Sequence, residues 1–331
     1  MKFLLFISAV CMSLIGSSSG WAASSVSGLS IIIPPDGSFV ESSVISVELN
    51  GWKTMVDEIA ISVNDHKQDV TEKKLERYDM CYTGIRLSYG MNNITITGFK
   101  NGRKVHELTT RVFFRSDLSP LASNAPDGFK KYLFHTGKYE KKCSSCHELD
   151  FRKAGDPESP EQSPCYVCHK KILSNYKFVH GPAAVWSCLM CHDGKSKNPK
   201  LAVPSPVSQF CKNCHDTSWD TKKYLHAPTA AGSCTVCHNP HGSDKPYFLR
   251  TNAGDLCLSC HEEIPTRPHV ISSFSSENGH PLKDRPDPSR PGSELTCTSC
   301  HNPHGGNSSV FLNGYDEDKP RKFFCMSCHK W

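Results

Sequence analysis

The chain has 331 residues, a formal charge of +5 and 37% hydrophobic residues. This length allows two domains, and the weak positive charge excludes the basic stripe that nucleic-acid binding requires. Eighteen cysteines and seventeen histidines exceed what an ordinary enzyme of this size contains, so something other than aliphatic side chains must supply part of the core.

The N-terminus has the pattern of a secretion signal. Lys2 precedes an apolar run over 3–15, small residues follow, and Gly20-Trp21-Ala22 offers a cleavage site after Ala22. This order is typical of a signal peptide, and the apolar run is too short to span a bilayer. We therefore expect a signal peptide over 1–22 and a secreted mature protein, periplasmic or extracellular, without a transmembrane segment.

Residues 24–118 predict an all-β domain. Six β-rich runs are separated by turn signals such as Asn64-Asp65 and Asn101-Gly102. Short strands at this spacing favour a β-sandwich. The runs are Leu29–Ile33, Val44–Leu49, Ile59–Val63, Ile85–Tyr89, Ile94–Phe99 and Val105–Phe114.

Part of this region also resembles a known module. The stretch from Gly90 to Phe114, which includes Asn93-Ile94-Thr95-Ile96-Thr97-Gly98, is similar to the last strands of bacterial immunoglobulin-like modules. The resemblance covers this region alone and implies an immunoglobulin-like sandwich. Cys81 is expected to be a small core side chain. Residues 119–134, with Pro120 and Pro126, predict a linker.

The region 135–331 contains eight C-x-x-C-H motifs. In this motif two cysteines form thioethers to haem vinyl groups and the adjacent histidine binds the iron, so the sequence predicts eight covalent c-type haems. The cysteines are Cys143, Cys146, Cys165, Cys168, Cys188, Cys191, Cys211, Cys214, Cys234, Cys237, Cys257, Cys260, Cys297, Cys300, Cys325 and Cys328. The histidines that follow are His147, His169, His192, His215, His238, His261, His301 and His329.

Two other interpretations of these cysteines account for fewer of the observations. Zinc ribbons also use C-x-x-C pairs, but they do not need a histidine directly after the second cysteine. A disulfide framework suits a secreted chain, but it gives no reason for the eight histidines. Covalent haem accounts for both residue types.

The motifs are arranged as four pairs that begin at 143, 188, 234 and 297, with the second members at 165, 211, 257 and 325. A repeat of about 45 residues indicates a tandem array. Asn-Pro-His-Gly follows the motif at 239–242 and 302–305, whereas the first two repeats have Glu148-Leu149-Asp150 and Asp193-Gly194-Lys195 there. These features resemble the doubled-CxxCH family of multihaem cytochromes, which implies closely packed haems with mostly two histidine ligands each.

Within 135–331, the histidines outside the motifs are the candidate distal ligands. They are His135, His180, His226, His241, His269, His280 and His304. Seven candidates for eight irons leave one iron without a distal ligand. Because the first two repeats lack Asn-Pro-His-Gly, we expect the missing ligand to belong to one of them. The eighth ligand could be His66 or His106 of the β domain, could come from another subunit, or could be absent.

The expected fold is therefore a two-domain protein. An N-terminal all-β, immunoglobulin-like sandwich precedes a multihaem cytochrome c domain of short helices and loops packed on haems. The expected function is electron transfer along the haems in extracytoplasmic respiration, without a catalytic residue. The alternatives are a multihaem reductase for nitrite, hydroxylamine or a sulfur oxyanion, and a polymerising extracellular cytochrome. The expected partners are periplasmic or outer-membrane redox proteins and further copies of the chain, not nucleic acid.

Overall fold

The computed structural model describes residues 28–51, 55–74, 80–115, 124–144, 147–153, 155–174, 176–197, 199–264, 286–320 and 322–329. The predicted signal peptide, Cys146, His269 and His280 lie outside the described residues.

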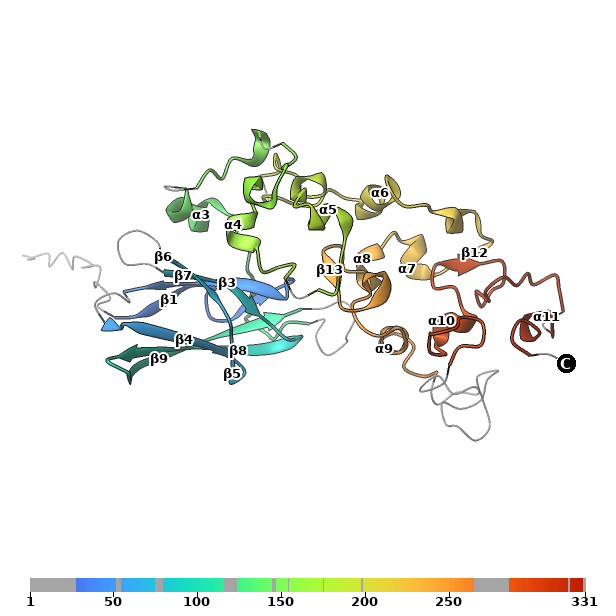
Figure 1. Cartoon of the computed structure of the whole chain (residues 1–331), viewed down its shortest axis with the longest axis horizontal. Coiled ribbons are helices and arrows are strands. Elements are labelled where there is room, and N and C mark those ends of the chain that lie inside the picture. Colours follow the sequence, from blue (N-terminus) through green and yellow to red (C-terminus); the bar gives the residue numbers. More distant parts are fainter. Residues whose placement is uncertain are drawn as a thin grey trace, which may run out of the picture.

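The N-terminal part consists of two packed β-sheets (Figure 1). One sheet has the order β1-β3-β7-β6 and the other has the order β10-β2-β9-β8-β4-β5. Neighbouring strands are antiparallel except β2–β9 and β10–β2, which are parallel. The strands are β1 Ser30–Ile33, β2 Ser38–Val40, β3 Val44–Asn50, β4 Glu58–Val63, β5 His66–Lys67, β6 Thr71–Lys74, β7 Met80–Arg86, β8 Gly90–Lys100, β9 Arg103–Phe114 and β10 Lys130–Lys131.

The core of this part forms because alternate residues along each strand point between the sheets. On β3, Val47 and Leu49 are completely buried, and on the facing sheet Ile94 and Ile96 of β8 are buried to the same degree. The side chains of both sheets therefore pack into one hydrophobic cluster, as the alternating sequence pattern predicted.

Two turns predicted from the sequence are confirmed. Asn64 and Asp65 have φ values of 48° and 66° and join β4 to β5, and Asn101 and Gly102 have φ values of 49° and 71° and join β8 to β9. Positive φ at both central residues defines the type I′ turn, whose twist matches that of a hairpin.

The strand expected over 85–89 lies earlier in the chain than the sequence indicated. β7 ends at Arg86, and the chain then turns around the buried side chain of Asn92. The Oδ1 atom of Asn92 accepts a hydrogen bond from the Ser88 N–H at 2.9 Å, and its Nδ2 donates to the carbonyls of Ser88 and Gly90. A polar side chain just beyond the run thus decides where the strand ends.

The C-terminal end of the predicted linker over 119–134 is part of the sandwich rather than a free linker. The Lys130 N–H donates to the Gly37 carbonyl and the Tyr132 N–H to the Phe39 carbonyl, both at 2.9 Å. The Tyr132 ring packs against the sandwich core and lies edge-on to Tyr139, with 5.3 Å between ring centroids. The β-sheet therefore leads directly into the first helix of the C-terminal part.

From residue 137 onwards the chain forms short helices, two-residue strands and loops, which extend away from the sandwich towards the C-terminus (Figure 1). The helices are α3 Gly137–Cys143, α4 Tyr166–His169, α5 Gly181–Ala184, α6 Val207–Lys212, α7 Ala227–Ala230, α8 Cys234–Cys237, α9 Ala253–Leu258, α10 Cys297–Cys300 and α11 Lys322–Cys325. The 3-10 helices are η1 Phe151–Lys153, η2 Pro160–Gln162, η3 Cys188–Met190, η4 Ser218–Thr221 and η5 Pro246–Phe248. The strands are β11 Phe178–Val179, β12 Tyr224–Leu225, β13 Gly242–Ser243 and β14 Gly305–Gly306.

The two parts contact each other beside α4. Lys171 Nζ donates to the carbonyl of Asp69 at 2.7 Å and lies 3.1 Å from its carboxylate. The aliphatic part of Lys171 covers Gly84 of β7 so closely that a Cβ atom there would lie 2.5 Å from it. Within the described ranges, no helix combines the length and the apolar character needed to cross a membrane.

Candidate haem-binding sites

The same backbone hydrogen bond occurs in all eight C-x-x-C-H motifs. In each, the N–H of the histidine donates to the carbonyl of the first cysteine over 2.9 to 3.1 Å, as between His147 and Cys143 or His238 and Cys234. Residues four apart in one helical turn lie on the same side of the chain. The first cysteine and the histidine of every motif are thus presented to the same side.

Ten of the predicted ligands form five pairs of imidazole rings. The ring centroids are 6.1 Å apart for His135 and His169, 5.8 Å for His180 and His215, 6.2 Å for His192 and His241, 6.1 Å for His226 and His261, and 6.1 Å for His238 and His304. Each pair joins one motif histidine to one histidine outside the motifs.

These distances fit two imidazoles on opposite faces of one haem iron. A bond from a metal to an imidazole nitrogen is about 2 Å long, and the ring centre lies roughly 1 Å beyond the nitrogen. Two such rings have centroids about 6 Å apart, as the five pairs do.

The outer ring nitrogens are held by backbone carbonyls. Nδ1 of His180 donates to the Pro240 carbonyl and Nδ1 of His226 to the Pro303 carbonyl, both at 2.9 Å. Nδ1 of His192 donates to the Leu201 carbonyl at 2.9 Å. Such bonds fix the tautomer that leaves Nε2 free to bind a metal, and they raise the basicity of the ligand.

His135 has a charged partner in place of a carbonyl. Its Nδ1 lies 2.9 Å from the buried carboxylate of Glu140, which also accepts a hydrogen bond from Lys200 Nζ at 2.8 Å. Burial lowers the pKa of His135 despite this contact, and burial also lowers the pKa of His241 to about 4. Both rings are therefore neutral near pH 7, as a metal ligand must be. Glu140 and Lys200 carry no signal in the sequence that marks them as parts of this site, because neither belongs to a motif.

The pairs follow a rule that connects the repeats. His135, His180 and His226, which precede a pair of motifs, each face the second motif histidine of the same repeat. His241 and His304 of the two Asn-Pro-His-Gly segments face the first motif histidine of the preceding repeat, His192 and His238. The partner of His192, which the sequence left open, is thus supplied by the third repeat.

Short strand pairs connect the repeats whose histidines face each other. β11 pairs with β13 and β12 with β14, so the segment before His180 lies against the segment after His241. Gly242 has a φ of 152°, and a Cβ atom there would lie 2.6 Å from the Phe178 carbonyl oxygen. The glycine of Asn-Pro-His-Gly is therefore required by the close approach of the two chains.

From the second motif to the eighth, consecutive motifs lie near each other. The thiols of neighbouring motifs are close enough to interact at every junction from the second motif to the eighth. These thiol pairs are Cys165 with Cys188, Cys191 with Cys214, Cys211 with Cys234, Cys237 with Cys260, Cys257 with Cys297, and Cys300 with Cys328. The motifs are thus arranged in space in their order along the sequence.

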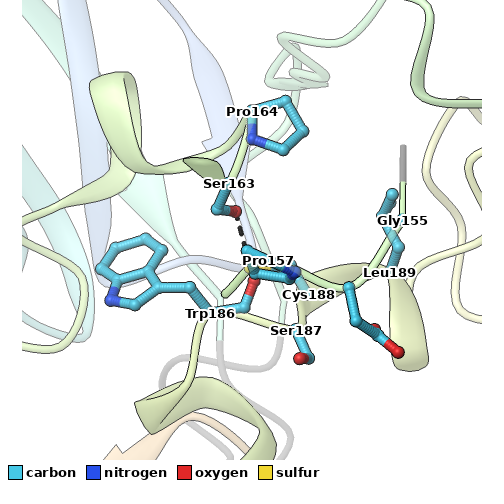
Figure 2. A pocket seen from close by; sticks show the side chains of 9 residues that line it. Gly155, Pro157, Ser163, Pro164, Trp186, Ser187, Cys188 and Leu189 are labelled. Carbon is cyan, nitrogen blue, oxygen red and sulfur yellow. Dashed lines mark hydrogen bonds between the residues drawn. The ribbon is translucent and has the colours of Figure 1, made fainter. Parts of the chain in front are cut away.

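Figure 2 shows a small hollow at one of these junctions, between Cys188 and the segment that leads to the second motif. The Ser163 hydroxyl closes one side by donating to the Trp186 carbonyl at 3.2 Å. Because Cys188 is itself one of the predicted thioether residues, the hollow belongs to the surroundings of the third motif rather than to a separate substrate site.

Zinc and disulfide bonding are not supported among the described residues. There, no group of three or more His, Cys, Asp or Glu residues could hold a metal ion by itself, and the described cysteines, including Cys81, form no disulfide bond with one another. A pair of histidines suits an iron whose other four ligands come from a porphyrin, whereas structural zinc needs four protein ligands.

Several predicted ligands are not members of the five pairs. His147, His301 and His329 belong to described motifs, whereas His269 and His280 fall outside the described residues. In the β-sandwich, His66 Nδ1 lies 2.7 Å from the Asn64 carbonyl of its own turn, and His106 pairs across the β8–β9 hairpin with Gly98.

A family model described as "Doubled CXXCH motif" matches residues 180–218, 226–266 and 290–331. This match supports a multihaem c-type cytochrome that binds haem covalently and carries electrons. No curated protein matches the chain. The crystal structure of a putative beta-galactosidase from Bacteroides fragilis shares 9% identity over 23% of this chain and 11% of its own length, with a TM-score of 0.20. This likeness is too weak to support an argument.

Proposed function

We propose that this protein carries electrons through eight covalent c-type haems arranged in their order along the sequence. The observation that supports this order is that the thiols of consecutive motifs, from the second to the eighth, lie close enough to interact electrostatically, and half of these pairs are hydrogen-bonded. The thioethers lie at the haem edges, so adjacent thiols bring adjacent haem edges together. A row of this kind moves electrons without a substrate pocket.

The residues around each haem support a carrier role. In five sites a histidine pair would occupy both axial positions, which closes the iron to substrates and favours lower potentials than His/Met ligation. The paired histidines hold and orient the group through their Nδ1 hydrogen bonds, and the haem supplies the one-electron chemistry when bound.

We further propose that the sandwich is an immunoglobulin-like module that supports the haem region. Its strand order, with β1-β3-β7-β6 facing β9-β8-β4, matches the ABED and GFC sheets of that fold. We place the protein in the periplasm or at the cell exterior, where other redox proteins or further copies of the chain would be its partners.

The test is haem content followed by electron transfer. Protein made with c-type maturation machinery should have an intact mass that corresponds to eight haems after removal of the signal peptide, and each haem should be reducible. A count of six or fewer would contradict the proposal. Replacement of Cys234 and Cys237 by alanine should remove a haem from the middle of the row and slow electron transfer between its ends. Replacement of Cys325 and Cys328 should remove only the last haem and serves as the matched control.

A further inference from the structure

The segment that follows the third motif has the same backbone structure as the two Asn-Pro-His-Gly segments. In all three, the residue directly after the motif histidine donates its N–H to a carbonyl nine residues further on. Asp193 donates to Ala202, Asn239 to Phe248 and Asn302 to Phe311, over 2.8 to 2.9 Å. Three loops with different sequences therefore close in the same way.

The ring of the motif histidine is fixed in the same way in the three loops. Nδ1 donates to a carbonyl nine residues further on, at Leu201 for His192, Tyr247 for His238 and Val310 for His301, over 2.6 to 2.9 Å. The loop is thus attached to its own motif at both ends.

The position three residues after the motif histidine is also equivalent in the three loops. The N–H of His241 donates to the Asn239 side chain at 3.1 Å, and the N–H of His304 to the Asn302 side chain at 3.0 Å. The N–H of Lys195 donates to the Asp193 side chain at 2.8 Å. Lys195 therefore occupies the backbone position from which His241 and His304 supply a distal ligand.

The pairing of His241 and His304 with earlier motifs indicates which motif histidine the position of Lys195 would face. His241 faces the first motif histidine of the preceding repeat, and His304 does the same one repeat later. The corresponding target of Lys195 is the first motif, which contains His147. The loop does pack against that repeat, because a Cβ atom on Gly194 would lie 2.8 Å from the carbonyl oxygen of Phe151, just after the first motif.

A lysine changes what the distal position can do. A neutral imidazole binds iron through Nε2, whereas a lysine ammonium has no lone pair and offers only hydrogen-bond donors. The Lys195 side chain is exposed. The five described histidines outside the motifs of this region are already paired with other motif histidines.

We infer that the haem held by Cys143, Cys146 and His147 has an open distal position that accepts one small ligand, with the Lys195 ammonium beside it to favour an anion. This inference rests on the proposal that every motif carries a haem. It assigns to the first haem a ligand-binding role in addition to electron transfer.

The test uses the monomeric, fully haem-loaded protein isolated by gel filtration, with eight haems verified by mass. Cyanide added to the oxidised protein and carbon monoxide added to the reduced protein should each bind one haem in eight, and a matching high-spin ferric signal should disappear with cyanide. Lys195→His should convert this haem to low spin and abolish binding of both probes. Lys197→His, in the same loop but not at the equivalent position, is the control and should leave binding unchanged.

The reciprocal variant His241→Lys should open the haem of the third motif and raise the binding to two haems in eight. Eight low-spin haems in the wild-type monomer, or unchanged probe binding in Lys195→His, would overturn the inference. Neither result would affect the proposed electron transfer, which fails only if the haem count falls short or the haems are not reducible.

Discussion

The sandwich and the haem region are stabilised in different ways. Among the described residues, seventeen buried hydrophobic side chains lie between Leu29 and Phe114, whereas only Phe151 and Trp186 are buried beyond them. The sandwich can bury one face of each sheet by itself, but the haem region has too few apolar side chains to do so. The difference indicates that the porphyrin faces form the core of the second region, so folding and haem attachment are coupled there.

The largest expected effect comes from withholding the haems. Protein expressed without maturation machinery should keep a folded sandwich, while the rest of the chain loses its tertiary structure for want of a core. Limited proteolysis followed by mass spectrometry should yield a resistant fragment of residues 28–132, which includes β10. Resistance of residues 143–329 in the haem-free protein would show that side chains alone stabilise this region.

Two valine-to-alanine substitutions on β9 compare a buried with an exposed side chain of the sandwich. Val112 is completely buried and Val105 is 45% exposed. Val112→Ala should lower the free energy of unfolding of the sandwich by about 2 kcal/mol, through lost burial and a new cavity. Val105→Ala should change it by less than about 0.5 kcal/mol. Denaturant unfolding followed by circular dichroism measures both, and the haem spectrum should not change in either variant.

Asp287 is a buried carboxylate, and its replacement tests whether its hydrogen bonds stabilise the last repeat of the haem region. Its side chain is fully buried and accepts hydrogen bonds from Ser299 Oγ at 2.6 Å and Arg290 Nε at 2.8 Å, and so connects the preceding loop to the seventh motif. Asp287→Asn should destabilise this repeat by about 2 kcal/mol, because charged hydrogen bonds are lost. Hydrogen exchange over residues 286–301 provides the measurement, with the exposed Asp318→Asn as the control. Equal exchange in both variants would contradict the role of Asp287.

The same carboxylate predicts a pH dependence. Burial alone would raise the pKa of Asp287, but hydrogen bonds from Ser289, Ser299 and Arg290 hold it well below its usual range. A pKa that is lower in the folded than in the unfolded protein contributes stability above the unfolded pKa, and that contribution is lost as the pH falls through the folded pKa. The protection factors of this repeat, which correct for the intrinsic pH dependence of amide exchange, should therefore fall below about pH 4 in the wild type and change less in Asp287→Asn. A parallel fall in both would contradict this linkage.

The smallest expected effect concerns a turn. Gly102 has a φ of 71° in the β8–β9 turn, so Gly102→Ala should cost about 1 kcal/mol of sandwich stability through left-handed backbone strain. Gly137→Ala at the start of α3, where an added Cβ atom meets nothing within 4 Å, should not reduce stability. Thermal unfolding of the two variants distinguishes these outcomes, and equal losses would contradict the role of the turn.

Local patterns determined much of this protein without the fold. Alternation predicted strands at β3, β4, β8 and β9, the dipeptides Asn64-Asp65 and Asn101-Gly102 predicted two turns, and the repeated motifs predicted the haem chemistry. These features depend on residues close together in the chain, so the sequence alone carries them. The short strand β2 and the end of β7 escaped prediction, because a parallel partner and the buried Asn92 decide them.

Only the tertiary structure decided which histidine faces which. The seven histidines outside the motifs are chemically alike, and the sequence could count them but could not pair them. His241 faces His192 of the preceding repeat, and the pairing of β11 with β13 holds the segment before His180 of that repeat against the segment after His241. The equivalence of Lys195 and His241 likewise became visible only from the hydrogen bonds that close their loops. A ligand pair depends on directions in space, and a linear pattern specifies composition and spacing but not the directions of residues that are distant along the chain.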